Sequence, residues 1–386
     1  MRFSFLSVLA LVALSGCVIN SADSTEAGAP DPEAKADGGG GATLPPADGT
    51  KLPFAPSNVA QPSFKDLDEV TISSNCTLNT DSGTIGCLDP KKVRFGYAKV
   101  EQGKGASQVA VFTMRSLRIQ PSAILRVKGS LPLVLLTATT LEIFGGLDAS
   151  STYDANVGGF GAGKTAGGGP GGGAGGERDY NGGAGGSYCG LGGGGGAVNG
   201  APAQASAAYG NPELSPLLGG SAGGPSAGSG ETYNGGAGGG AVQLAAGVAV
   251  TVGIGGFVSV GGGATLRGGG GSGGSILVEA PAVNIQGALA ANGGGGASDK
   301  SLHDATCGLP NASSAAGNTS TSGRGSAGTQ TAGGVGQPEP SYLPGGGSGG
   351  GGAGRIRINS VGAAQIAGIV SPSAGTPCFT QGKLSN

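Results

Sequence analysis

The stretch LVLLTATTLEIFGGLDAS, residues 133–150, shares its pattern with SILVEAPAVNIQGALAAN at residues 275–292. The two align without a gap, and the matched positions are Leu141 with Val283, Ile143 with Ile285 and Leu147 with Leu289. Apolar residues alternate with polar or small ones, which is typical of strands with one buried face. A glycine shared by both copies allows a sharp bend within each. The stretch therefore predicts short strands joined by bends.

Three more segments carry the same pattern, at residues 117–131, 241–260 and 355–371. In the first of them, Leu125 takes the place of Leu141, and Val127 that of Ile143. A unit this short cannot bury its apolar face alone, whereas stacked units can. We therefore expect an all-β fold, a parallel β-helix (β-solenoid) of about five or more coils. Residues 242–260 have the length of a membrane helix, but their alternation and internal glycines favour a coil of strand.

Glycine provides 88 of the 386 residues, while charged residues make up only 11%. Glycine disfavours a helix interior by about 1 kcal/mol per residue, so almost no helix is expected. The densest glycine lies in inserts at about 156–240, 261–274 and 292–354. Two arrangements fit such inserts: structureless loops, or extended polyglycine layered beside the solenoid. The sequence does not decide between them.

The chain opens with an apolar run after Arg2 and reaches the sequence Leu14-Ser15-Gly16-Cys17. The run fits a signal peptide, residues 1–16, and is too short to span a bilayer. The four residues resemble the lipobox of bacterial lipoproteins, which implies a lipid on Cys17 and anchoring in the outer membrane. Residues 17–65 are rich in Ala, Pro, Gly and Asp and predict a flexible tether. Residues 66–116 are expected to form a small β cap that precedes the solenoid at 117–386.

Five cysteines follow Cys17, in a compartment where disulfides form. Cys76 and Cys87 flank a turn signal between two short β-like runs, so a disulfide across this hairpin is expected. Cys189 and Cys307 both lie in glycine-rich inserts and are the second pair that we predict, with Cys378 left over. No cysteine spacing is that of a zinc or redox site, and no metal or cofactor is expected.

The string GGFGAGKT at residues 158–165 has the form of a phosphate-binding loop. A working loop needs a buried strand before it and a helix after it, but polar residues precede this string and glycines follow it. We interpret it as a chance match, with no nucleotide bound. The net charge of −2 gives no indication of a nucleic-acid partner. The basic residues between Lys91 and Lys128 are interpreted as a solvated surface.

Catalytic candidates are few in this chain. A carbohydrate-active β-helix enzyme needs clustered carboxylates, whereas Glu142 and Glu279 occupy different positions of the repeat. Glu177 and Asp179 lie inside a glycine-rich insert, where nothing rigid would hold them. The single histidine, His303, is interpreted as a polar loop residue. We therefore expect no enzyme, with a polysaccharide lyase or hydrolase as the alternative.

Tyrosines gather in or beside the glycine-rich inserts. Each ring either packs over bare glycine backbone or offers an exposed aromatic face to glycans and other surface polymers. The six residues are Tyr153, Tyr180, Tyr188, Tyr209, Tyr233 and Tyr342.

The lipobox, the cysteine hairpin and the repeated units together resemble the glycine-rich parallel β-helix surface lipoproteins of myxobacteria-like bacteria. The resemblance covers most of the chain and implies an architecture rather than an activity, because such proteins are mostly uncharacterised. It implies a lipid-anchored protein of the outer membrane, periplasmic or surface-exposed. We expect a structural or adhesive role, with cell-surface polysaccharide or envelope proteins as partners.

Overall fold

The computed structural model describes residues 49–103, 106–152, 157–177, 180–198, 200–228, 232–298, 304–338 and 345–384. Within these ranges every regular element is a β-strand, so the predicted all-β class is confirmed. The same ranges contain no helix long and apolar enough to cross a membrane. Residues 242–260 in particular are strands and bends rather than one apolar helix.

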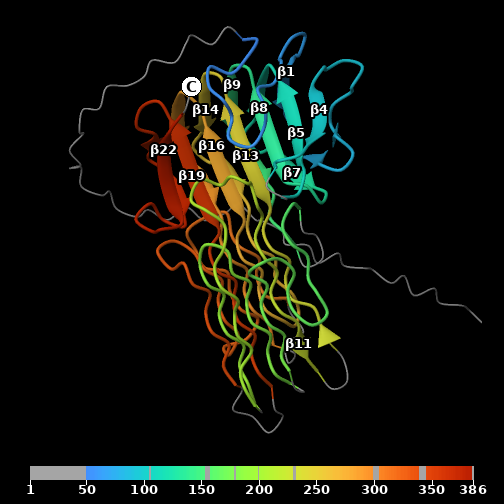
Figure 1. Ribbon diagram of the computed structural model, residues 1–386, viewed down its shortest axis with the longest axis vertical. Coiled ribbons are helices and arrows are strands. Elements are labelled where there is room, and N and C mark those ends of the chain that lie inside the picture. The colour runs from blue at the N-terminus through green and yellow to red at the C-terminus, as the bar shows by residue number, and fades with distance from the viewer. Residues whose placement is uncertain are drawn as a thin grey trace, which may run out of the picture.

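Three large sheets and one hairpin hold the strands (Figure 1). The six-stranded sheet, in spatial order, consists of β1 (Glu69–Ile72), β6 (Ser116–Ile119), β9 (Thr140–Ile143), β14 (Ala249–Val252), β17 (Ala282–Ile285) and β20 (Gln365–Ile366). The first seven-stranded sheet consists of β21 (Ile369–Ser371), β18 (Ala288–Ala290), β15 (Phe257–Ser259), β10 (Gly146–Asp148), β7 (Ile124–Lys128), β2 (Cys76–Asn79) and β3 (Thr84–Ile85). The second consists of β22 (Phe379–Lys383), β19 (Arg355–Ser360), β16 (Ser275–Glu279), β13 (Ala241–Ala246), β8 (Leu133–Thr137), β5 (Val109–Met114) and β4 (Gly96–Val100). The hairpin pairs β11 (Ser226–Ala227) with β12 (Thr232–Tyr233).

The predicted parallel β-helix of about five coils is wrong as an architecture. The strands divide among separate sheets, and none of those described is a closed or solenoid sheet. Both seven-stranded sheets end in an antiparallel pair, β2 with β3 and β4 with β5, so their strand directions are mixed. The chain also does not pass directly from the last strand of one repeat to the first strand of the next. Long glycine-rich segments separate β10 from β13 and β18 from β19.

The internal repeat itself is visible in the strand register. Val252 pairs with both Ile143 and Ile285, and so joins the two positions that the aligned stretches equate. The alignment of residues 117–131 is corrected, because Leu125 pairs with Leu147 and not with Leu141. Leu141 pairs with Leu117 instead. Residues 117–131 contain both β6 and β7. The predicted alignment placed β7 on β9, although β9 is the counterpart of β6.

The inward side chains of the three large sheets form one hydrophobic core. Leu141, Leu147 and Leu135, one from each sheet, are all buried in it. Residues 66–116, expected to be a separate cap, provide the first strands of these same sheets, since β1, β2 and β5 pair in parallel with β6, β7 and β8. We call this assembly the three-sheet body.

The end of the predicted tether, residues 49–65, is not free. Leu52, Phe54 and Phe64 are buried in a second apolar cluster, together with Val134 and Leu277 of β8 and β16. The asparagine Asn58 adds hydrogen bonds to Leu214 O (2.9 Å) and Gln243 Oε1 (3.1 Å). Residues 49–65 therefore form a strap over the outer face of the second seven-stranded sheet.

The glycine-rich segments leave the three-sheet body together and form an elongated bundle that ends beyond β11 (Figure 1). Their hydrogen bonds follow a period of three. The amides of residues 346, 349 and 352 donate to carbonyls of residues 180–186, those of 347, 350 and 353 to residues 331–337, and those of 348, 351 and 354 to residues 291–297. Three residues per turn is the geometry of a polyproline II helix. We call this bundle the glycine lattice.

Residues 269–274 repeat the pattern with other neighbours. Their six amides donate in turn to residues 221–224, 349–352 and 260–263, at 2.8 to 3.0 Å. A Cβ added to Gly271 would lie far inside contact distance of the Ala237 carbonyl oxygen. Since successive residues face different neighbours, each side of the segment lies against another backbone, and only the small side chain of Ser272 is accommodated, with its hydroxyl donating to Ser221 O. The inserts are therefore extended, layered polyglycine, as the second arrangement predicted, but the layers project from the end of the three-sheet body and do not lie beside a solenoid (Figure 1).

Candidate functional site

Two of the six tyrosines predicted as possible surface-binding residues pack against each other within the protein. The rings of Tyr188 and Tyr209 lie 4.6 Å apart between centroids, and Tyr188 is only 1% exposed. Tyr209 Oη donates to Gly219 O at 2.6 Å and accepts from Ser221 Oγ at 2.9 Å. Burial raises the pKa of Tyr188 to about 12 and also raises that of Tyr209. This pair joins the glycine lattice to the loop around Tyr209, as expected of a ring that packs over glycine backbone.

Two other tyrosines lie beside the hairpin of β11 and β12 in the glycine lattice, where they are half-buried. Tyr180 N donates to Ala227 O of β11 at 2.9 Å, and Tyr233 ends β12. The Arg267 guanidinium carbon lies 4.1 Å from the Tyr233 ring centroid, a cation–π arrangement that the sequence did not indicate. Leu266, beside Arg267, is 46% exposed. We call these four residues the tip cluster; Tyr153 and Tyr342 lie outside the described residues.

Tyr180 also has an unusual backbone, with φ of 69°. A left-handed conformation at a non-glycine residue costs roughly 1–3 kcal/mol and is frequent at functional positions. The tip cluster therefore comprises two half-buried tyrosines, a cation stacked on Tyr233 and the exposed Leu266, with the left-handed backbone at Tyr180 alone. Such a surface suits contact with sugars or other polymers that offer both apolar and polar groups.

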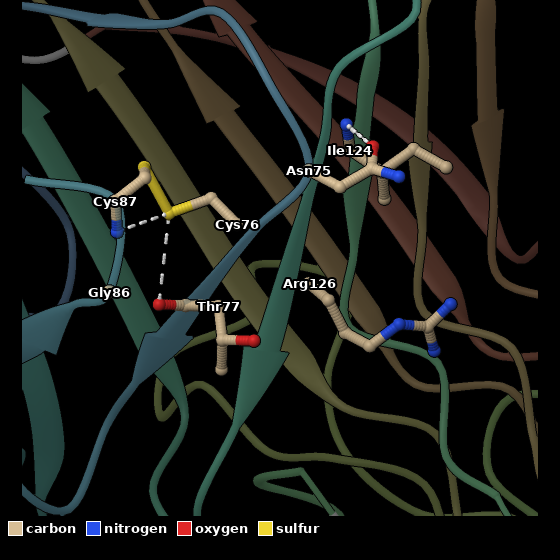
Figure 2. Close-up of a pocket in the computed structure, with 7 residues that line it drawn as sticks. All are labelled: Asn75, Cys76, Thr77, Gly86, Cys87, Ile124 and Arg126. Atoms are coloured by element: carbon tan, nitrogen blue, oxygen red, sulfur yellow. Dashed lines mark hydrogen bonds between the residues drawn. A yellow bond between two sulfur atoms is a disulfide. The ribbon is translucent and has the colours of Figure 1, made fainter.

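A surface cavity of about 430 Å³ lies on the first seven-stranded sheet (Figure 2). It is lined by Asn75, Cys76, Thr77, Gly86, Cys87, Ile124 and Arg126. The predicted disulfide between Cys76 and Cys87 is confirmed and forms one wall. Arg126 comes from the neighbouring strand β7, and its Nη2 lies 3.0 Å from Oδ2 of the buried Asp148. A disulfide and an arginine thus line the same cavity.

A second cavity, of about 240 Å³, lies where the strap crosses β16 and β19. At its base Glu279 is 1% exposed. Its carboxylate accepts from Ser57 N (3.2 Å), Ser57 Oγ (2.5 Å), Gln243 Nε2 (2.7 Å) and Asn359 Nδ2 (3.2 Å). Four donors occupy the carboxylate oxygens, so Glu279 is engaged in holding the strap.

The remaining carboxylates named from the sequence are dispersed. Glu142 pairs with Arg118 at 2.8 Å on the six-stranded sheet, far in topology from Glu279 on the second seven-stranded sheet. Glu177 is exposed, while Asp179 and His303 lie outside the described residues. In the part of the chain that the structure describes, no three Asp, Glu, His or Cys side chains gather as metal ligands.

The string at 158–165 lacks the surroundings of a phosphate-binding loop. Lys164 and Thr165 are exposed, and the residues that follow belong to the glycine lattice instead of a helix. The strand that precedes it, β10, ends at Asp148. The string therefore has neither the strand nor the helix N-terminus that would cradle a phosphate.

The second predicted disulfide is wrong, because Cys189 pairs with Cys378 and not with Cys307. Cys189 N donates to Ala353 O at 3.0 Å, just before β19, and Ile356 of β19 donates to Cys378 O at 2.9 Å. Both cysteines thus lie beside the same strand. Cys307 is buried with Ala264, Ala297 and Ala305. Cys17, the predicted lipidation site, lies outside the described residues.

Comparison with protein-family profiles, with curated proteins and with solved structures finds no match for this chain. The function is therefore argued from the chain's own residues.

Proposed function

We propose that the protein is a non-enzymatic, extracytoplasmic surface protein with a structural or adhesive role, anchored in the outer membrane by lipid on Cys17. The observation that carries the proposal is the hydrogen bonding of residues 346–354, in which nine successive amides donate to three neighbouring segments. A backbone satisfied on every side, with almost no side chains inside, suits a rigid extension. It holds few groups that catalysis would need.

The tip cluster is the contact surface in this proposal. The glycine lattice holds it away from the three-sheet body (Figure 1). Tyr180 and Tyr233 supply aromatic faces, and Arg267 supplies a cation for acidic groups of a polysaccharide. Polymers of the cell envelope offer many copies of a weak site along one chain, so several protein molecules on one surface would bind them with avidity.

Binding of the purified full chain to a glycan array and to cells tests the adhesive role. Replacing Tyr233 and Arg267 together by alanine should lower binding at least tenfold, because the two side chains pack on one another. Lys164→Ala, an exposed change elsewhere on the glycine lattice, should leave binding unchanged. If the unchanged protein binds no surface polymer, the adhesive half of the proposal fails.

The anchor has its own test in the producing bacterium. Metabolic labelling with a fatty acid should mark the wild-type chain, and Cys17→Ser should abolish the label. The variant should also move from the detergent phase to the aqueous phase, since the acyl chains provide about 0.8 kcal/mol of membrane affinity per buried CH₂. Label retained in Cys17→Ser would refute lipidation at this residue.

A further inference from the structure

The disulfide between Cys76 and Cys87 joins one buried and one exposed cysteine beside a cavity. It closes a loop of only 11 residues and lies on the wall of the 430 Å³ cavity (Figure 2). The second disulfide, Cys189 with Cys378, borders neither of the two cavities, and Cys378 is 2% exposed. The two disulfides therefore differ in how easily a dissolved thiol reaches them.

The two sulfurs of the accessible disulfide are not equivalent. Cys87 is an exposed residue, whereas Cys76 is 8% exposed at the start of β2. The Cys87 backbone N–H donates to Cys76 Sγ at 3.0 Å, as the dashed line in Figure 2 shows. A hydrogen bond to sulfur stabilises the thiolate over the thiol, because it favours the charged form. This hydrogen bond offsets the burial of Cys76 in the apolar core, so Cys76 is the leaving group. Cys87, which is exposed, is the sulfur open to attack.

We propose that Cys76–Cys87 is a thiol–disulfide exchange site at which a small anionic thiol becomes linked to Cys87. The thiolate of the incoming molecule attacks Cys87 Sγ and forms a new S–S bond. The Cys76–Cys87 bond breaks, and its electron pair leaves on Cys76 Sγ, which then takes a proton from water. One disulfide replaces another, so the step needs no oxidant or reductant besides the thiol.

The charge of the cavity selects the class of thiol. Arg126 is the charged residue among those that line it, and its side chain extends from β7 away from the sulfurs, toward Asp148 of β10 (Figure 2). Its side chain is 34% exposed although it also pairs with Asp148. The field of this cation attracts a carboxylate or sulfonate on a thiol that enters the cavity. This inference does not depend on the proposed adhesive function.

Incubation of the folded full chain with 2-mercaptoethanesulfonate tests the proposal. After alkylation of free thiols, peptide mass spectrometry should find the adduct on Cys87 and the alkyl group on Cys76, in at least tenfold excess over the reverse. Cys189–Cys378 should remain intact over the same period. An adduct chiefly on Cys76, earlier loss of Cys189–Cys378, or no adduct at all would overturn the proposal.

The class of thiol is tested with cysteamine, a cationic thiol of similar size. At equal thiolate concentration and low salt, the sulfonate should react about threefold faster, and the difference should shrink at 1 M salt, where charges are screened within about 3 Å. Equal rates at low salt would reject the anionic class.

The difference between the two sulfurs is tested with single-cysteine variants. In Cys76→Ser, the remaining Cys87 should still accept the sulfonate from its symmetric disulfide, whereas Cys76 in Cys87→Ser should react more slowly. Equal reactivity of these two variants would reject the asymmetry.

Discussion

Glycine is required in this protein wherever a residue faces a neighbouring backbone. Gly271 donates to Gly263 O, and a Cβ at this position would overlap the Ala237 carbonyl. A backbone neighbour cannot rotate aside as a long side chain can. Gly362 is the opposite case, with no atom within 4 Å of an added Cβ and no positive φ. A comparison of Gly271 with Gly362 therefore distinguishes a steric requirement for glycine from the general abundance of glycine in the chain.

Gly271→Ala should lower the free energy of unfolding by about 3 kcal/mol, the upper part of the range for overpacking. Gly362→Ala should change it by less than about 0.5 kcal/mol, as surface substitutions do. Urea unfolding followed by circular dichroism measures both. Equal, small effects of the two variants would mean that the lattice is not closely packed at Gly271.

Two arginines form ion pairs between strands, but with partners of different burial. Arg126 pairs with Asp148, which is 1% exposed, and Arg118 pairs with Glu142, which is 32% exposed. Removing the first arginine leaves a buried carboxylate without its cation, which typically costs 3–5 kcal/mol. Removing the second leaves the Glu142 carboxylate, which water already reaches, and costs at most about 1 kcal/mol.

Arg126→Gln should therefore destabilise the protein by about 3 kcal/mol, and Arg118→Gln by less than about 1 kcal/mol. Thermal unfolding at constant pH compares them. A larger effect for Arg118→Gln would contradict the assigned difference in burial.

The strap is an element that holds the body without forming a strand. Its aromatic side chains lie on the outer face of β8, β13 and β16, and its Ser57 reaches the buried Glu279. Phe54→Ala should cost about 3 to 4 kcal/mol, as for other buried phenylalanines. Ile254→Ala, at a position 82% exposed, should cost less than about 0.5 kcal/mol. If Phe54→Ala unfolds no more easily than Ile254→Ala, residues 49–65 are a free tether after all.

The buried Tyr188 predicts loss of stability at alkaline pH. The pKa of Tyr188 is raised by burial to about 12 in the folded protein, against about 10 in the unfolded chain. Folding therefore favours the neutral phenol, and this contribution is complete below pH 10. It is lost as pH rises from about 10 to about 12, by roughly 2 to 3 kcal/mol. Tyr188→Phe should flatten the fall in unfolding free energy over this window; an unchanged slope would contradict the assignment.

The strands were predictable from sequence because each contains its own signal. Leu141, Ile143 and Leu147 alternate with polar or small residues, and such a pattern needs no knowledge of the partners. The strap was not predictable, since Phe54 and Phe64 lie among Pro, Gly and Ala and become buried only through strands far along the chain. The pairing of Cys189 with Cys378 depends in the same way on Ala353 beside β19.

The whole molecule combines two ways of satisfying the hydrogen-bonding groups of a buried backbone. The three-sheet body does so with strand pairing around an apolar core, whereas the glycine lattice does so with three-residue turns and almost no side chains. The lattice has no apolar period for sequence reasoning to detect, because glycine occupies every face alike. Its partners, such as residues 269–274 with 349–352, also lie far apart in the chain. The tip cluster at its end was predictable only in part, through its tyrosines.

Residue-resolved amide hydrogen exchange on residues 269–274 and 346–354 tests the glycine lattice most directly. The period-three bonding predicts that every amide in both segments is protected, to an extent comparable with the central strands of the three-sheet body. A strand at a sheet edge would protect alternate amides only, and a solvated loop would protect none. Exchange at the unprotected rate throughout these two segments would contradict the account.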